Sequence, residues 1–161
     1  MTNPNPTTNP IIKKLEKLNI ILPPAAPPAA SYLPWIRSGN FVFISGQLPM
    51  EDGKMKYVGK VGADVSLEDG IAAARLCVLN VFSQLREATG GDFSKVCRCV
   101  RLGGFVNAPA DFEKHPAVIN GASETVLEIM EEAGQHARVA VGVSSLPFNA
   151  SVELEALFEV L

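Results

Sequence analysis

The stretch that decides the fold is HARVAVGVSSLPFNASVELEALFEVL, residues 136–161, which contains two runs of alternating apolar residues. The first run places valine at every second position from Val139 to Val143, and the second places an apolar residue at every second position from Val152 to Val160. Alternate residues of a strand point to opposite sides, so each run predicts a β-strand with one apolar face. We expect the two strands to form a hairpin around Leu146-Pro147.

Two charged residues stand off the apolar positions of these strands. Arg138 lies on the face opposite the valines, and Glu153 lies off the main apolar face of its own strand. A guanidinium can bind a carboxylate through two parallel hydrogen bonds, and a nearby glutamate can move protons on a water molecule. The pair indicates a small substrate that carries a carboxylate.

The spacing of this pair indicates a site between subunits. If the turn of the hairpin is centred near Phe148, Arg138 lies opposite a residue near position 158, which is offset from Glu153 by roughly 15–20 Å along the strand. One chain could not hold one small substrate with both side chains. Two chains could, if one supplies Arg138 and its neighbour supplies Glu153.

The rest of the chain predicts a two-layer α+β domain at residues 25–161, preceded by a tail and short helix at 1–24. Residues 1–8 read as a mobile tail, residues 9–19 as a short helix, and the proline-rich stretch 23–30 as an extended connector. The element order is then two strands, helix, strand, helix and two strands. We expect the helices on one face of the sheet and polar positions 138, 153 and 155 on the other. The predicted elements are strands at 35–37, 41–45 and 95–107, a helix from Ser66 to Gly90-Gly91, and a helix from Pro116 to Gly134.

A second informative segment lies upstream, at Tyr32 and at GNFVFISGQLP, residues 39–49. Together with Ala137-Arg138, Leu146-Pro147 and residues 152–155, it resembles the RidA family of reactive-intermediate (enamine/imine) deaminases, long called endoribonuclease L-PSP. The resemblance covers about residues 25–161. Two separated matches in the right order make it specific.

This resemblance implies a mixed-sheet, chorismate-mutase-like fold of the bacillus type, in which three protomers close their sheets into a central barrel. It also implies hydrolysis of enamine/imine acids such as 2-aminoacrylate to 2-keto acids and ammonia at a cleft between subunits. By the same resemblance Arg138 anchors the carboxylate, Glu153 directs water, and Tyr32 joins them as the third catalytic residue. The further positions that match the substrate pocket are Ser45, Gly46 and Asn120.

The sequence departs from the family pattern in three places, which indicates a divergent subgroup with altered pocket walls. His136 replaces a proline, Ala140 stands where many members carry a cysteine, and residues 107–120 differ. An alternative of another class is a regulatory trimer without turnover that senses a metabolite carboxylate through Arg138. Ribonuclease activity is a third possibility. The net charge of −3 and the lack of a basic stripe disfavour it, and no nucleic-acid partner is expected.

Composition sets the remaining expectations. Hydrophobic residues make up 47% of the 161, but no apolar run approaches the ~20 residues that a membrane span needs. The start of the sequence lacks a secretory pattern, and three cysteines cannot all pair, so we expect a cytoplasmic protein with reduced thiols in its core. Cys97-Arg98-Cys99 is a weak metal signal, and the two histidines have no zinc spacing, so no metal or cofactor is expected.

Overall fold

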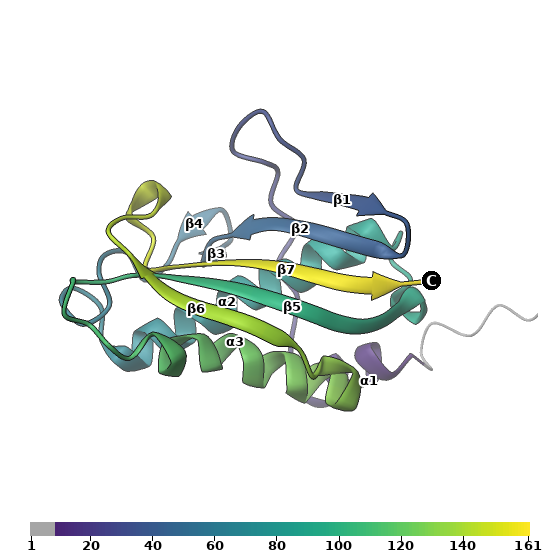
Figure 1. Cartoon of the computed structure of the whole chain (residues 1–161). Helices are drawn as coiled ribbons and strands as arrows, with labels where there is room; N and C mark the ends of the chain where they lie inside the picture. Colours follow the sequence, from purple (N-terminus) through teal and green to yellow (C-terminus); the bar gives the residue numbers. More distant parts are fainter. Residues whose placement is uncertain (1–8) are drawn as a thin grey trace, which may run out of the picture.

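Five strands form one sheet in the order β1-β2-β7-β5-β6, and the helices α2 and α3 lie together on one side of it (Figure 1). The structure is a computed structural model and describes residues 9–161. Only β5 and β6 are parallel, so the sheet is mixed. The predicted two-layer α+β architecture, with the helices on one face, is confirmed.

The elements follow the predicted order, with a small two-stranded ribbon and three short 3-10 turns added. The strands are β1 (Trp35–Ser38), β2 (Phe41–Gln47), β3 (Met50–Glu51), β4 (Lys54–Met55), β5 (Val96–Asn107), β6 (Ala137–Val143) and β7 (Val152–Val160); the helices are α1 (Pro10–Lys17), α2 (Leu67–Ala88) and α3 (His115–Met130); the 3-10 turns are η2 (Phe93–Lys95), η3 (Glu131–Gly134) and η4 (Pro147–Asn149).

Strand β7 carries the alternation that the sequence predicts. Its even-numbered residues from Val152 to Val160 are buried, and its odd-numbered residues are half-exposed. The buried set packs against the helix layer, where Phe158 and Phe82 of α2 place their rings 6.0 Å apart. The strand therefore has one face in the core and one face open.

The predicted hairpin between the last two strands is wrong. β6 and β7 do not pair, because β5 lies between them, antiparallel to β7 and parallel to β6. A strand, a helix and a parallel strand form a crossover unit, and β5, α3 and β6 are such a unit, so β6 is placed at the far edge of the sheet. The connection from β6 to β7, residues 144–151, has to pass over the end of β5, and it is longer than the usual hairpin loop.

Both long helices begin where their sequences predict, and α2 also ends as predicted. The predicted end of α3 at Gly134 is wrong: the helix ends at Met130, where Glu131 adopts a positive φ, and Glu131–Gly134 form the 3-10 turn η3. Ser66 caps α2, its hydroxyl accepting a hydrogen bond from the backbone N–H of Asp69 at 3.0 Å. After α2, Gly90 and Gly91 adopt φ of +66° and +82°, which are unfavourable for other residues. Pro116 occupies the first turn of α3, where its missing N–H costs no helix bond.

The glycine pair of β5 marks a close approach of side chains to the backbone. The strand continues through Gly103 and Gly104, and its register shifts lie upstream, between Val96 and Arg98 and between Cys99 and Arg101. A Cβ on Gly104 would lie 2.6 Å from Ile119 of α3, and one on Gly103 would lie 2.7 Å from Glu155 on the other face. Glycine thus allows packing on both sides of the same strand.

The cysteines only partly match the prediction of a thiol core. Cys77 and Cys99 are buried, whereas Cys97 is exposed, because the irregular start of β5 turns it away from the core. Burial raises the pKa of the Cys77 thiol well above its usual value and raises that of Cys99 to about 12. The two buried thiols are therefore protonated at neutral pH.

The short helix α1 packs against α3 through Ile11 and Leu15, both buried. Lys14 of this helix forms a salt bridge of 2.6 Å with Glu131 just after α3. The expected mobile tail, residues 1–8, lies outside the described residues. Within residues 9–161, no helix combines the length and hydropathy that crossing a membrane would require.

Candidate functional site

Arg138 lies at the edge strand β6 and points toward the helix layer. In the sheet it is aligned with Leu102 and Ala156, both of which are buried beneath the helices. Its guanidinium reaches α3 and binds three groups there, listed with their distances: Asn120 Oδ1 at 2.8 Å, Ser123 Oγ at 3.0 Å and the Pro116 carbonyl at 3.2 Å. The expectation that Arg138 shares the open face with Glu153 and Glu155 is therefore wrong.

These contacts fix the orientation of the Arg138 side chain and leave part of it available. A guanidinium has five N–H donors, and three are used toward α3, so two remain without a partner among the described residues. The side chain is half-exposed, and Asn120 is exposed beside it. Arg138 and Asn120, predicted to share a pocket, are in direct contact.

Glu153 lies on the open face of the sheet, directly beneath the backbone of Gly46. Its neighbours along the sheet are Phe105 and Val141, both on that face. The register of β2 shifts between Ile44 and Gln47, and this irregularity brings Gly46 over the carboxylate. A Cβ at position 46 would lie 2.0 Å from Oε1 of Glu153. Only glycine leaves room for the carboxylate.

The Glu153 carboxylate is half-buried, and it has no salt-bridge partner among residues 9–161. Burial raises its pKa, and the charge of Glu155 on the same face raises it further. Glu155 itself forms a salt bridge with Arg101, with an Nη1 to Oε1 distance of 2.9 Å. A carboxylate with a raised pKa and no partner is suited to taking and returning a proton.

Within one chain the two charged groups cannot meet. Arg138 points to the helix side and Glu153 to the open side, with strand β5 between their own strands. Arg138 is level with Ala156, three residues along β7 from Glu153, which places the two backbones about 14 Å apart. Arg138 and Glu153 of one chain are thus far apart, as predicted, but the cause is the intervening strand β5 and the opposite faces of the sheet, not the offset within a hairpin.

A cavity of about 320 Å³ lies beside Gly46, at the end of β2. Tyr32 and Gly46, both predicted site residues, line this cavity. Tyr32 is 46% exposed, and its hydroxyl accepts a hydrogen bond from the Ala29 N–H at 3.4 Å. The Ser45 hydroxyl donates a hydrogen bond to the Leu33 carbonyl at 2.6 Å, which links the segment just before β1 to β2. The larger cavity, of about 1110 Å³ beside α1, contains none of the predicted site residues.

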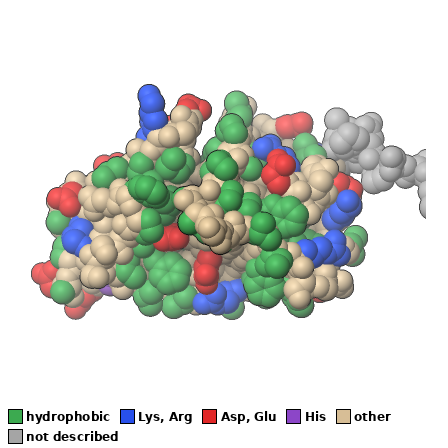
Figure 2. All heavy atoms as spheres, turned by 90° about the horizontal axis from the view of Figure 1, so that it is seen from above, with side chains coloured by type: hydrophobic (Ala, Val, Ile, Leu, Met, Phe, Trp, Pro, Cys, Tyr) green, Lys and Arg blue, Asp and Glu red, His purple; other side chains and the backbone are tan. Residues whose placement is uncertain are grey.

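The open face of the sheet is mostly apolar and uncovered. Four of its large side chains are between 39% and 56% exposed: Ile36, Phe41, Phe43 and Val141. Seen from above, hydrophobic side chains form several clusters over the surface, with acidic side chains between them near the middle (Figure 2). Exposed apolar surface of this extent is typical of a face that another protein covers.

Sequence reasoning missed two features of the site. Ser123 is a third ligand of Arg138, and its position three residues after Asn120 on a helix could have indicated a shared face. The cavity wall also includes Met50, Met55 and Phe148, which come from three separate segments and have no common motif. Within the described part of the chain, no cluster of three His, Cys, Asp or Glu side chains could hold a metal ion.

Comparisons with known proteins show the family and the fold. The family described as YjgF/chorismate mutase-like, putative endoribonuclease, matches residues 13–161. Among curated proteins, Protein TCP17 of Trypanosoma cruzi is 44% identical over 151 residues, covering 93% of this chain and 94% of that protein.

Solved structures show the same fold. Atu1372 of Agrobacterium tumefaciens, a protein of unknown function, superposes with a TM-score of 0.88 at 44% identity, covering 94% of this chain and 93% of that one. TdcF of E. coli, solved with bound serine, has a TM-score of 0.60 at 25% identity, covering 87% of this chain and 94% of that one.

Proposed function

This chain belongs to the YjgF/RidA family, and on that premise we propose that it hydrolyses enamine/imine acids to 2-keto acids and ammonia at a cleft between subunits of a homotrimer. The family supports processing of small molecules. The arrangement of Arg138 and Glu153 supports the more specific reaction and the cleft between subunits.

In this proposal Arg138 binds the substrate carboxylate. Its three contacts with α3 hold the guanidinium in place before the substrate arrives, so little conformational freedom is lost on binding. The two remaining donors match the two oxygens of a carboxylate. Asn120, which accepts a hydrogen bond from Arg138, presents its amide to the same ligand.

Glu153 of the neighbouring subunit activates the water. It accepts a proton from water as the oxygen forms a bond to the imine carbon, which gives a tetrahedral carbinolamine. It returns this proton to nitrogen and then carries the proton of the new hydroxyl to the same nitrogen. The C–N bond breaks, ammonia leaves, and the former hydroxyl oxygen becomes the carbonyl. No electrons are exchanged with another reactant. An enamine substrate first gains a proton on its β-carbon and loses one from nitrogen, which gives the imine.

The observation that supports this chemistry most directly is the Glu153 carboxylate itself. It is half-buried, lacks a salt-bridge partner among residues 9–161, and lies against Gly46, which lines an apolar cavity. A glutamate that served only solubility would be fully exposed. Tyr32 and Ser45 shape the cavity and its entrance in this proposal.

Subunit mixing tests the proposal. Arg138→Ala and Glu153→Gln are each expected to be inactive alone, because every cleft then lacks one of the two groups. Mixed trimers refolded from equal amounts contain both native residues in about one cleft in four, since each side must come from the right parent. Imine hydrolysis should therefore return to about a quarter of the wild-type rate.

Two other results would change the assignment. No recovery in trimers whose mixing is confirmed by mass spectrometry would reject the shared cleft. Wild-type protein that binds 2-keto acids but releases no ammonia from imines, generated in place by an amino-acid oxidase, would instead identify a carboxylate-binding or regulatory trimer.

A further inference from the structure

The cavity beside Gly46 has a firmly held wall. One side of it is the connector at residues 26–29, which has no regular secondary structure. Two buried side chains of α2 bind this connector: Ser83 donates to the Pro23 carbonyl at 2.6 Å, and Gln84 donates to the Ala26 carbonyl at 2.7 Å. The cavity is therefore built into the fold, since its wall is anchored to the helix layer.

The chemistry of the cavity is apolar. None of the described residues that line it is charged, and its apolar wall consists chiefly of Pro27, Pro28, Met50, Met55 and Phe148. Its two amide side chains already use their donors on backbone carbonyls: Asn80 binds those of Leu48, Met50 and Leu76, and Gln47 binds those of Ser45 and Gly46. Tyr32 is the one other polar side chain among the described lining residues, and a charged carboxylate would find no cationic partner there, whereas an alkyl or thioether group finds apolar contacts.

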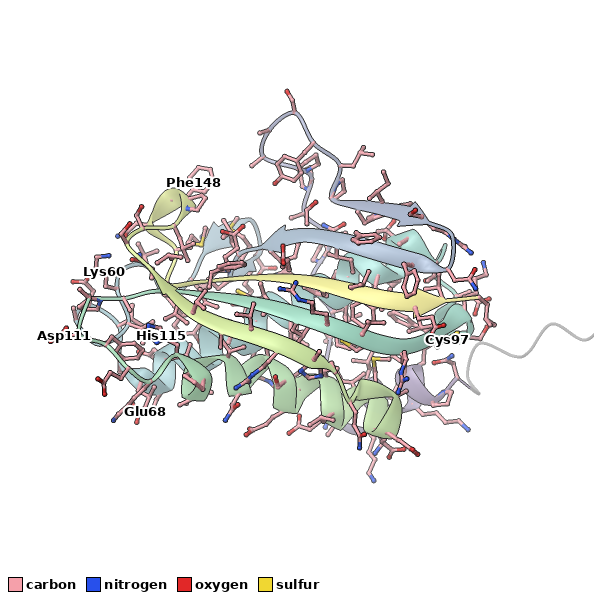
Figure 3. The ribbon with its side chains drawn as sticks, in the orientation of Figure 1. Lys60, Glu68, Cys97, Asp111, His115 and Phe148 are labelled. Atoms are coloured by element: carbon pink, nitrogen blue, oxygen red, sulfur yellow. The ribbon has the colours of Figure 1, made fainter. Side chains whose placement is uncertain are left out.

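Phe148 closes one side of the cavity from a strained loop. It stands out from the loop between β6 and β7 at one end of the sheet (Figure 3), and its side chain is 69% exposed. Phe148 and Asn149 both have positive φ, at +56° and +55°, which is uncommon for residues other than glycine. Strain of this kind is concentrated at ligand sites, where it holds a side chain in a required position.

We propose that this cavity is a side-chain subsite for 2-imino and 2-oxo acids whose side chains have the size and polarity of those of leucine or methionine. The inference rests on the proposed function, because it assumes that the reacting carbon lies by Glu153. Gly46 lines the cavity and touches Glu153, so a substrate held there can extend its side chain between Tyr32 and Phe148. The cavity volume of about 320 Å³ lies at the lower end of small-molecule sites, ~300–1,000 Å³.

Calorimetry with two 2-oxo acids tests the subsite. Burial of one methylene group strengthens binding about fourfold, so 4-methyl-2-oxopentanoate should bind at least about tenfold more tightly than pyruvate. Phe148→Ala and Met55→Gln should each reduce this ratio to about threefold or less. Ile21→Ala, at a residue that is 91% exposed and outside the cavity, is the matched control and should leave the ratio unchanged.

Binding and hydrolysis separate the subsite from the proposed function. Equal affinities for the two acids, or no binding of either, would overturn the subsite whether or not imines are hydrolysed. Preferential binding of the larger acid together with no ammonia release would retain the subsite and reject the proposed reaction.

A second inference comes from the hydrogen bonds behind Arg138. Ser123 Oγ accepts from Arg138 Nη1 at 3.0 Å, so its own proton is directed to Nε2 of His136 at 2.9 Å. The other ring nitrogen, Nδ1, lies 2.6 Å from the Gly134 carbonyl, which can only accept, so Nδ1 carries the proton. Each donor is thus matched with an acceptor along this series of hydrogen bonds, which runs from Arg138 through Ser123 and His136 to the Gly134 carbonyl and which we call the relay.

We infer that Ser123 and His136 are positioning residues that orient Arg138 for carboxylate binding. The inference rests on the proposed function of Arg138, and it gives a role to the residue that stands in place of the family's proline. If it holds, disruption of the relay weakens carboxylate binding and leaves the chemical step at Glu153 almost unchanged. KM should then rise while kcat stays within about twofold.

Two substitutions of one histidine separate positioning from packing. The side-chain oxygen of Gln can occupy the Nε2 position, and the side-chain nitrogen of Asn can occupy the Nδ1 position. His136→Gln should therefore keep an acceptor for the Ser123 hydroxyl and leave KM close to that of wild type. His136→Asn and Ser123→Ala remove this hydrogen bond and should raise KM and the Kd for 2-oxo acids about fivefold to tenfold.

The melting temperature distinguishes a purely structural role. Equal effects of Gln and Asn at position 136, or an unchanged Kd in Ser123→Ala, would overturn the relay. The same holds if all three variants lose stability and kcat together. Ammonia release by wild type is measured alongside, so failure of the proposed function would be recognised separately.

Discussion

Gly46→Ala is the most direct test of the Glu153 site. The new Cβ would lie 2.0 Å from Oε1 of Glu153, and real Cβ contacts do not come below 3.0 Å, so the carboxylate has to move by about 1 Å. The backbone at position 46 does not require glycine for its φ angle, since its φ is not positive. The substitution thus displaces the proposed base with little other cost to the fold.

A displacement of about 1 Å at a reacting group lowers the rate about 100-fold. We therefore expect kcat for imine hydrolysis, followed by ammonia release, to fall about 100-fold in Gly46→Ala. Gly103→Ala is a matched control on the same open face, because its Cβ would meet Glu155 at 2.7 Å instead of Glu153. It should reduce kcat by no more than a few fold.

The reasoning would be refuted by a Gly46→Ala protein with wild-type kcat and a melting temperature close to wild type. A crystal structure of such a variant with Glu153 in its original place would lead to the same conclusion. Equal losses in the Gly46 and Gly103 variants would indicate a general effect on the sheet and not on the base.

Three further predictions concern charge, recognition and assembly. Glu155→Gln should move the acid limb of the pH–rate profile to lower pH, because loss of the neighbouring charge lowers the raised pKa of Glu153, and an unmoved limb would separate that limb from Glu153. Arg138→Lys should restore little of the 2-keto-acid affinity lost in Arg138→Ala, because lysine lacks the planar fork, and equal affinity by calorimetry in Lys and wild type would contradict this. Light scattering at micromolar concentration should give the mass of a trimer, and a stable monomer would leave the exposed apolar face, including Ile36 and Phe43, unexplained.

Local features of the fold could be predicted from sequence because they depend on neighbouring residues. Alternation of apolar residues located β7, and the cap at Ser66 located the start of α2. Strand pairing is not local, and the hairpin prediction failed because it joined the two strands nearest in sequence. The preference for parallel pairing in a strand, helix and strand unit was available and would have placed β6 beside β5.

The candidate site was predictable only in part, for the same reason. Arg138 and Glu153 stand out as charged residues within apolar strands, but the alternation does not reveal which partners surround them. Asn120 and Ser123 come from α3, whose distance from β6 depends on the crossover. The cavity combines the connector, the β3–β4 ribbon and the loop at Phe148, and no sequence spacing relates these three segments.

Arg138 and Glu153 are separated within one chain because each side chain needs a different position in the sheet. The Arg138 side chain on an edge strand can reach helix backbone and side-chain acceptors, and these hold it on the helix side of the sheet. Glu153 lies on an inner strand, and a break in the register of its neighbour β2 places Gly46 over its carboxylate, where the absence of a side chain leaves room for it. One sheet cannot provide both environments at one point, because Arg138 needs an edge strand, whereas Glu153 needs an inner strand with neighbours on both sides. A second copy whose β6 edge approaches the open face of the first would bring the two environments together, so the proposed catalysis and the proposed assembly depend on each other.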